Sequence, residues 1–412
     1  MRGSAIRGFE EGKPPSFRHD NPTGPLHPVL VDIERTIEED ASLFMGFHQM
    51  FKQIPDEPKF HFDPTGKPQV RSYKEMLHRI QAILTQSPEF GDPSVLLEKM
   101  IPVPINAMLN WPNNTPAGRH IFRHPVVNTH FKKILDVWAE FLSSPESRYI
   151  LTDNDPRGWF TPSALAVLTG GEPFDSLFAC DRSQEHFGFA SWDDFFTRQF
   201  RPGARPVASP QDDSIVVSPC KATPYKISSN VQYQAEFWIK EQPYSISHLL
   251  HSHSLTSLFI GGTVYQAGLS ATSYHRWHSP VSGQIIDISH VPGTYYATSP
   301  ALGFTSAALG KSQGYISHLA TRMIVFIRAV SEPLGVVAFV AVGMAAASSC
   351  EATVRVGEDV RKGDQLGMFH YGGSSFCLVF RRESGITFNE NVFQSLEGQK
   401  VVQVNSALGL VL

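Results

Sequence analysis

A pair of glycines followed by a pair of serines, directly before an apolar strand, is the feature that most constrains this chain. Residues 372–375 read Gly-Gly-Ser-Ser, and residues 376–380 are an unbroken apolar run. Glycine adopts strained backbone conformations that other residues avoid, so the next serine can turn its hydroxyl onto the preceding carbonyl. This geometry suits an N→O acyl shift, in which Ser374 attacks its own backbone. The sequence therefore predicts self-cleavage at Gly373–Ser374, at the head of a rigid strand.

A second stretch, at residues 274–283, favours self-cleavage over the alternative that residues 372–375 are only a turn between strands. Gly-Gly-Ser-Ser by itself is usually a flexible loop between strands. The second stretch reads Tyr-His-Arg-Trp-His-Ser-Pro-Val-Ser-Gly and holds two histidines, His275 and His278. Histidine titrates near neutral pH, so the pair offers acid–base groups, although either one alone is more often structural. The two stretches together indicate an enzyme.

Together these motifs resemble the phosphatidylserine decarboxylase family of pyruvoyl enzymes. The family pattern Tyr-His-Arg-x-His-x-Pro-x-x-Gly is complete at residues 274–283. The pattern Lys-Gly-(Asp/Glu)-x-Leu-Gly-x-Phe is matched at residues 362–369, ahead of the serine. A third element, Phe-Phe-x-Arg-x-(Leu/Phe) followed by Arg-Pro, is matched at residues 195–200 and 205–206. The three motifs occur in the family's order, and the resemblance covers residues 190 to 412.

The resemblance implies a chain that makes its own cofactor. Cleavage would divide the precursor, or zymogen, into a large chain of residues 1–373 and a small chain of residues 374–412, which stay partners. Ser374 would become a covalent pyruvoyl group, an electron sink that does the work of pyridoxal phosphate elsewhere. Neither pyridoxal phosphate nor a metal is expected.

The resemblance also implies roles for individual residues. His278 is assigned to activation of Ser374, and His275 to decarboxylation through proton handling at the substrate Cα. A second set is expected to pack around and shape the substrate pocket: Tyr274, Trp277, Ser375 and Phe376.

One position departs from the family. The acid that orients the serine-activating histidine sits in a Pro-Ala-Asp-Gly-like turn, which here reads Ser-Pro-Cys-Lys-Ala at residues 218–222 and places Lys221 where a carboxylate is expected. A charged lysine would lower the pKa of a neighbouring histidine by like-charge repulsion. Three explanations stay open: a local misalignment with Asp212 or Asp213 as the acid, an engineered change that traps the precursor, or a naturally slow or non-processing homologue.

The patterning predicts an α+β fold. Residues 1–28 are rich in Gly, Pro and charge and are expected to be a disordered lead. Residues 29–204 form a helical domain, with caps at Ser72, Thr161 and Ser191. The apolar residues of this domain recur at helical spacing: Leu30, Ile33, Ile37, Phe44, Phe47, Phe51, Phe131, Ile134, Leu135, Trp138 and Phe141. Residues 205–412 are expected to form a compact β-rich catalytic domain, docked tightly on the helices.

The strands of this β-rich domain are predicted at residues 215–217, 258–265, 284–288, 323–327, 336–342, 352–356 and 401–404.

Composition excludes some functions and suggests a compartment. The net charge of −4 gives no electrostatic reason to bind nucleic acid. The four cysteines lack metal-ligand spacing and suggest reduced thiols in a cytoplasmic protein. The longest apolar run, residues 336–347, is too short to span a bilayer, so no stable membrane insertion is expected.

His248, His251 and His253 could form a metal site, but a polar surface segment is the simpler interpretation. Homo-oligomers are possible.

Two substrate classes remain within the family. The helical N-terminal region, the Gly-Gly-Ser-Ser variant and the Cys-Glu-Ala-Thr-Val run at residues 350–354 resemble the soluble fungal branch, which acts on free aromatic amino acids. We therefore expect decarboxylation of tryptophan to tryptamine. The alternatives are a phosphatidylserine decarboxylase that makes phosphatidylethanolamine, and an unprocessed inactive homologue disabled by Lys221. A serine hydrolase is disfavoured, because Ser374 lacks a G-x-S-x-G elbow.

The self-cleavage hypothesis predicts two bands on a denaturing gel, with an intact mass for the small chain that matches residues 374–412 bearing a pyruvoyl terminus. The Ser374→Ala chain should stay in one piece and yield no amine from tryptophan, because it lacks the attacking hydroxyl. Amine production by that variant would rule out the pyruvoyl chemistry.

Overall fold

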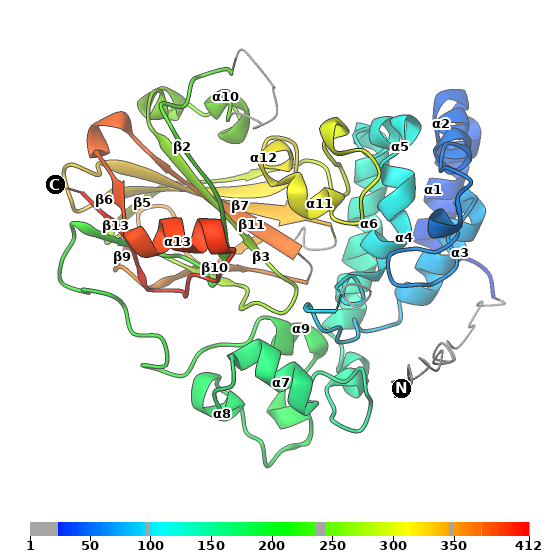
Figure 1. The fold of residues 1–412 in the computed structure, drawn as a ribbon, viewed down its shortest axis with the longest axis horizontal. Helices are drawn as coiled ribbons and strands as arrows, with labels where there is room; N and C mark the ends of the chain where they lie inside the picture. Colours follow the sequence, from blue (N-terminus) through cyan, green and yellow to red (C-terminus); the bar gives the residue numbers. More distant parts are fainter. Residues whose placement is uncertain (1–23, 96–98, 236–243, 346–349, 372, 412) are drawn as a thin grey trace, which may run out of the picture.

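A computed structural model describes residues 24–95, 99–235, 244–345, 350–371 and 373–411 (Figure 1). The predicted disordered lead therefore lies mostly outside the described residues. Its end is close to the predicted boundary, because the first helix begins at Pro28, with His27 as its N-cap.

The helical region is built mainly from helices with a proline in the first turn or a polar N-cap. Ser72 Oγ accepts a hydrogen bond from Glu75 N, Thr161 Oγ1 from Ala164 N, and Ser191 Oγ from Asp194 N, so the three predicted caps are confirmed. The α-helices are α1 (Pro28–Glu39), α2 (Ala41–Lys52), α3 (Tyr73–Ile83), α4 (Pro104–Asn113), α5 (Pro116–Ile121), α6 (Pro125–Leu142), α7 (Pro162–Thr169), α8 (Phe174–Leu177) and α9 (Trp192–Phe196).

The apolar stripe over residues 30–51 forms two helices, because Asp40 interrupts it. The Asp40 carboxylate accepts hydrogen bonds from Ser42 N and Leu43 N and so starts α2. Phe44, expected on the buried face, is 37% exposed. The expectation was wrong for Phe44 because α2 begins a new helical phase after the break.

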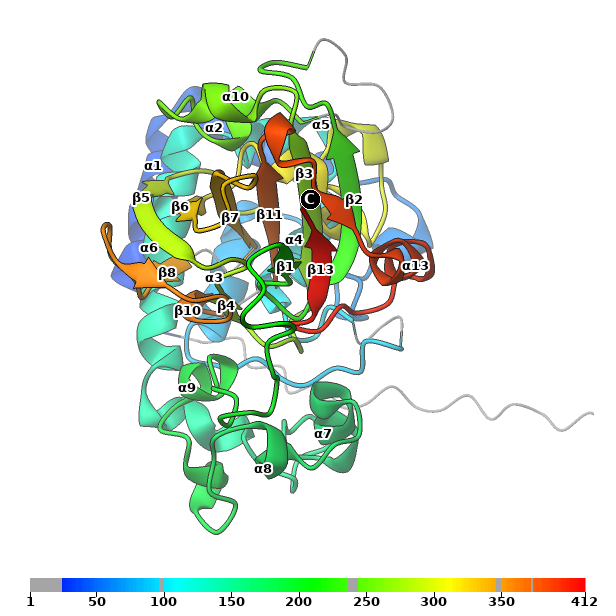
Figure 2. The same cartoon turned by 90° about the vertical axis from the view of Figure 1, so that its left-hand side faces the viewer.

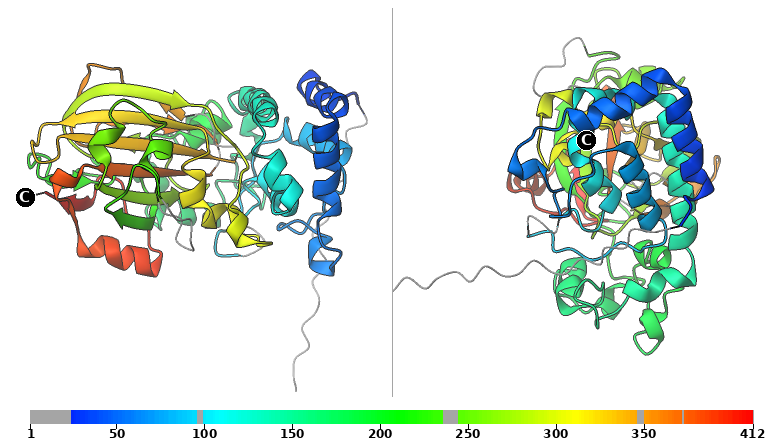
Figure 3. Two further views of the ribbon diagram at one scale, coloured as in Figure 1. Left: turned by 90° about the horizontal axis from the view of Figure 1, so that it is seen from above. Right: turned by 90° about the vertical axis from the view of Figure 1, so that its right-hand side faces the viewer.

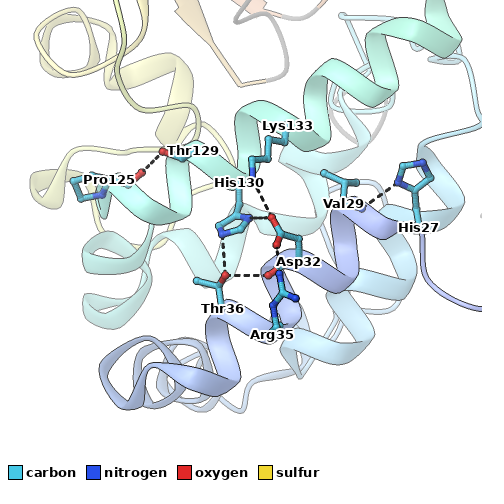
Figure 4. Close-up of polar contacts among 9 residues, drawn as sticks. All are labelled: His27, Val29, Asp32, Arg35, Thr36, Pro125, Thr129, His130 and Lys133. Carbon is cyan, nitrogen blue, oxygen red and sulfur yellow. Dashed lines mark hydrogen bonds and ion pairs between the residues drawn. The ribbon is translucent and has the colours of Figure 1, made fainter.

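A polar cluster joins α1 to α6 on the outer side of the helical region (Figure 4). Asp32 accepts hydrogen bonds from Lys133 Nζ at 2.9 Å and from Arg35 at 2.6 Å. His130 Nε2 lies 3.0 Å from Thr36 Oγ1, and its Nδ1 lies 3.5 Å from Asp32. These contacts fasten the first helix to the long helix α6.

The rest of the chain is dominated by an antiparallel sheet of seven strands in the order β2-β3-β11-β7-β6-β5-β9. Figure 2 shows β5, β6, β7, β11, β3 and β2 side by side in this order. Two three-stranded sheets, β1-β13-β12 and β4-β10-β8, pack beside it.

The strands are β1 (Ile215–Val217), β2 (Thr223–Ser229), β3 (Thr263–Leu269), β4 (Arg276–His278), β5 (Gly283–Val291), β6 (Arg322–Ala329), β7 (Val336–Met344), β8 (Cys350–Ala352), β9 (Asp359–Val360), β10 (Gln365–Phe369), β11 (Gly373–Phe380), β12 (Thr387–Phe388) and β13 (Ala407–Leu410). The helices among them are α10 (Ile246–Leu249), α11 (Ala308–Lys311), α12 (Gln313–Ile316) and α13 (Glu390–Gly398).

Most predicted strands are present, with three corrections. The predicted strand at residues 401–404 is only an isolated bridge between Val402 and Ala222, and the last strand is β13. The segment predicted at 258–265 begins with a 3₁₀ turn (Thr256–Phe259), and the strand starts at Thr263. The strand predicted at 352–356 shares only Ala352 with β8, and residues 353–356 are not in a strand. All three errors have one cause, since apolar runs next to turns resemble short strands.

The helical region and the sheet share one hydrophobic core. One core cluster combines helical residues such as Phe131 and Trp138 with Val340, Cys377 and Val379 of the sheet, while a second cluster fills the opposite face of the sheet. The predicted α+β fold, with helices packed on a β-rich part, is confirmed. Figure 3 shows the helices against one end of the sheet. The division at residue 204 stays a prediction.

Lys362 of the Lys-Gly-Asp motif holds the connection between the two parts. Its side chain is 4% exposed, and its Nζ donates to the carbonyls of Ser209 at 2.8 Å, Asp212 at 2.7 Å and Ile215 at 3.0 Å. An ammonium group has three donors, and here all three bind the backbone of one connecting segment. This motif lysine is therefore structural.

Replacing Lys362 by Met should lower the free energy of unfolding by about 2 kcal/mol, because the backbone carbonyls lose a charged donor. The comparison is made by urea unfolding of uncleaved Ser374→Ala chains. The exposed Lys400 provides the control, and Lys400→Met should change stability by less than about 0.5 kcal/mol. Equal stability of the two lysine variants would contradict this role.

Candidate active site

Ser374 lies near the start of the central strand β11 and is completely buried. It pairs with Leu269 of β3 on one side and Gly343 of β7 on the other. Because strand side chains alternate, Ser374 shares a face with Phe376 and faces the second core. Its Oγ has no hydrogen-bond partner among the described residues. A buried hydroxyl in that state is costly, and reactive groups are among those for which such a cost is tolerated.

His275 lies close to the segment that leads into the cleavage site. Its ring is completely buried and stacks on Phe196 at 4.0 Å between centroids. The same Phe196 ring contacts Tyr371, and His275 O accepts a hydrogen bond from Phe369 N at 2.9 Å. The Phe-Phe-x-Arg motif thus supplies the aromatic platform for the first histidine of the pair.

His278 is held by two other groups. Its Nδ1 lies 2.8 Å from Gly363 O, and its Nε2 lies 2.9 Å from the Tyr274 hydroxyl. A carbonyl only accepts, so Nδ1 carries the proton and Nε2 accepts from Tyr274. Burial lowers the pKa of His278, which favours this neutral tautomer. The predicted activation of Ser374 by His278 stays a prediction, and it requires Nε2 to exchange the Tyr274 hydroxyl for that of Ser374.

The Lys221 segment lies beside His278, but the lysine side chain turns away from it. His278 N donates to Pro219 O at 2.9 Å, whereas Lys221 Nζ donates to Leu168 O of α7 at 3.1 Å. The pKa of His278 is lowered, as expected, but Lys221 is not among the groups that lower it. Burial lowers the pKa of His278 most, and the charges that act on it are those of Arg276 and Asp364.

The group that contacts His278 Nδ1, where the resemblance implies an orienting acid, is the Gly363 carbonyl. Asp212 is engaged elsewhere, because its carboxylate accepts hydrogen bonds from Ser214 N and Oγ. Burial, followed by the positive charges of Arg198 and Arg205, lowers the pKa of Lys221 to about 8.

The residues expected to shape the pocket occupy different surroundings. Trp277 and Phe376 are fully buried in the second core and both contact Phe339. They therefore support the strand that carries Ser374. Tyr274 is buried against Phe200 at 4.1 Å, and its role is the hydrogen bond to His278. Ser375 points to the opposite face, where Gln266 Nε2 donates to its Oγ at 3.4 Å.

His370, four residues before Ser374, is a residue whose importance the sequence did not reveal. Its Nδ1 lies 2.8 Å from Asp193 of α9, and its Nε2 lies 2.8 Å from Glu351 of β8. Burial alone would lower the pKa of His370, but the hydrogen bonds and charges of Asp193 and then Glu351 raise it to about 9. The protonated ring ties α9 and β8 to the cleavage segment. Asp193 is 177 residues away from His370 in the chain, so no local pattern could have paired the two.

The histidines suggested as a metal site do not converge. His253 stacks on Phe326 at 4.4 Å, and its Nδ1 accepts a hydrogen bond from Leu255 N. Within the described ranges, no group of three or more His, Cys, Asp or Glu side chains could hold a metal ion. No helix among these residues is long and apolar enough to cross a membrane.

Comparison with known proteins agrees with this geometry. A family model described as phosphatidylserine decarboxylase matches residues 192–409, and a second model of the same description matches residues 27–168. Decarboxylase iboD of Amanita muscaria is 39% identical over 351 residues, which are 81% of this chain and 99% of that protein.

L-tryptophan decarboxylase of Psilocybe cubensis is 34% identical over 408 residues, 95% of this chain and 88% of that protein. Phosphatidylserine decarboxylase proenzyme 3 of Schizosaccharomyces pombe is 31% identical over 209 residues, 50% of this chain and 20% of that protein.

The chain belongs to the phosphatidylserine decarboxylase family. It is a pyruvoyl-type carboxy-lyase, since the family uses a pyruvoyl group. The residues present fit that group, because the buried Ser374 Oγ, which has no partner within the described ranges, lies at the head of a strand hydrogen-bonded on both sides. Leu269 and Gly343 would flank the group on the neighbouring strands.

The His370 cluster predicts a pH-dependent stability. The folded-state pKa lies above the ordinary value of 6.5, so the added stability is complete below pH 6.5 and is lost as the pH rises through about 9. Urea unfolding of Ser374→Ala chains with and without His370→Gln should therefore show a stability difference that is largest near pH 6 and shrinks toward pH 9. The exposed His120 serves as control, and His120→Gln should give no such trend. A pH-independent stability difference for His370→Gln would contradict the stabilising role of the protonated His370 ring.

Proposed function

We propose that this protein decarboxylates a free aromatic L-amino acid, with tryptophan to tryptamine favoured, after cleaving itself at Gly373–Ser374. The single observation that carries the cleavage step is that Ser374 Oγ is buried and has no hydrogen-bond partner in the part of the chain that the structure describes. The proposed substrate is supported by the relatives. The L-tryptophan decarboxylase of Psilocybe cubensis aligns with 95% of this chain, whereas the phosphatidylserine decarboxylase proenzyme 3 of Schizosaccharomyces pombe aligns with 50%. The proposed location is the cytoplasm.

The chain's own residues prepare the reaction in three ways. Pairing of β11 with β3 and β7 fixes residue 374 against movement. Phe196 holds the His275 ring by stacking, which positions a proton carrier for the substrate Cα. The second core, with Trp277 and Phe376, excludes water from one side of the site. A pyruvoyl group there supplies a ketone that condenses with the substrate amine and takes up the electron pair left by departing carbon dioxide.

Two alternatives are kept because particular observations favour them. Phosphatidylserine decarboxylation is favoured by the family name and by relatives that align with the catalytic half. A dormant precursor is favoured by Lys221, because a lysine stands at the position where the family has an acid. The side chain of this lysine binds Leu168 O. The substitution of the Gly363 carbonyl for that acid argues for retained processing.

The deciding experiment combines intact-mass analysis with three substrates. The purified protein is incubated with tryptophan, with phenylalanine and with phosphatidylserine vesicles, and carbon dioxide and the amine product are quantified. We expect two fragments and fastest turnover of tryptophan. Turnover of the vesicles alone would replace the proposal by the lipid activity, and a single full-length band with no turnover would support the dormant precursor.

The processed enzyme also allows a test of His275. Replacement by Ala after cleavage cannot be made directly, so the turnover of a His275→Ala chain is normalised to its cleaved fraction, which is quantified on a denaturing gel. We expect a loss of kcat of about a hundred-fold or more, because the proton carrier is removed. Undiminished turnover in the cleaved fraction would remove His275 from the chemistry.

A further inference from the structure

The carboxamide of Gln313, the first residue of α12, lies across β11 at the level of the scissile bond. Its Nε2 would be 3.2 Å from a Cβ placed on Gly268, and it lies 3.8 Å from Met344 Sδ. Gly268 pairs with Ser375, and Met344 pairs with Gly373. These two neighbours bracket the Gly373–Ser374 peptide bond.

This carboxamide is buried and its hydrogen-bonding capacity is largely unused. Gln313 is 6% exposed, and its Oε1 has no partner within the described part of the chain. Its Nε2 faces a thioether sulfur, which is a weak acceptor. The backbone of Gln313 is nevertheless held firmly, because its carbonyl accepts a hydrogen bond from Gln266 Nε2 at 3.0 Å, and Gln266 in turn accepts one from the Tyr244 hydroxyl.

Gln313 and the Ser374 side chain are on opposite faces of β11. Ser374 points with Phe376 toward the second core, whereas Gln313 covers Gly268 and Met344 on the face of Ser375. A hydroxyl that attacks the Gly373 carbonyl from one face makes the carbonyl carbon tetrahedral. The carbonyl oxygen then bends toward the other face while it gains negative charge. That is the face on which the Gln313 carboxamide lies.

We propose that Gln313 Nε2 donates a hydrogen bond to the Gly373 carbonyl oxygen as charge develops on it during self-cleavage. In the step, a bond forms between Ser374 Oγ and the Gly373 carbonyl carbon, the bond from that carbon to the Ser374 nitrogen breaks, and the hydroxyl proton ends on that nitrogen. No other reagent is needed. The inference rests on the proposed function and names the charge-stabilising donor of its first step.

The test follows cleavage directly, on a denaturing gel, after cell-free synthesis of the full chain. Gln313→Met keeps the length of the side chain and removes the donor, so we expect cleavage to slow by about a hundred-fold. Gln394→Met, on the exposed face of α13, should cleave at the wild-type rate. Cleavage of Gln313→Met at the wild-type rate overturns the inference, whereas failure of the wild-type chain to cleave overturns the proposed function itself.

A pH profile separates hydrogen-bond donation from a packing role. In Gln313→Glu the side chain donates only when it is protonated. The cleavage rate of Gln313→Glu, divided by the wild-type rate at each pH, should therefore rise as the pH falls, and the ratio for Gln313→Met should stay flat. A flat ratio for both variants would show that Gln313 only packs.

Gly268→Ala provides a second perturbation if the Gln313 variants fold poorly. The added methyl would meet Gln313 Nε2 at 3.2 Å and must displace the carboxamide by a few tenths of an ångström. We expect slower cleavage in the Gly268→Ala chain and no additional loss when it is combined with Gln313→Met. Additive losses, or an unchanged rate in Gly268→Ala, would contradict the inference.

Discussion

The structure depends on the hydrogen bonding of β11 along both edges. From Ser374 to Phe380 every residue of this strand pairs with β3 on one side and β7 on the other. This pairing on both edges holds residue 374 in one position in the sheet. The two cores press on alternate faces of the same strand, which places Ser374 and Ser375 in different surroundings although they are neighbours in sequence.

Side chains of the helical region hold the segment that leads into β11. Tyr371, three residues before Ser374, packs its ring between Trp138 of α6 and Trp192 of α9, and its hydroxyl donates to Pro102 O. Asp193 of α9 binds His370. The segment that enters the cleavage site is therefore clamped by side chains from the first half of the chain. This shared packing explains why the two halves form one core and why the resemblance to relatives can extend over nearly the whole chain.

The polar groups around the scissile bond divide into satisfied and unsatisfied ones. His278 is satisfied by Gly363 O and Tyr274, and Lys362 by three carbonyls, so both are held in one arrangement. Ser374 Oγ and Gln313 Oε1 are buried without partners within the described residues. Folding leaves such groups unpaired only at a cost, and reactive sites are where that cost is tolerated. These two unsatisfied groups lie on opposite faces of one strand, as the proposed cleavage step requires.

The sequence by itself determined the family, the helix caps and most strands, because these depend on residues close together in the chain, and it predicted the cleavage bond in the same way. Ser191, Thr161 and Ser72 start helices through contacts three residues away, and the run after Ser374 is a strand by its own composition. Only the tertiary structure decided the rest. The contact of Gly363 O with His278, that of Lys221 with Leu168 O, that of His370 with Asp193, and the place of Gln313 beside Gly268 all join distant segments. Such pairings follow from how the sheet and helices pack, and local patterns do not contain that information.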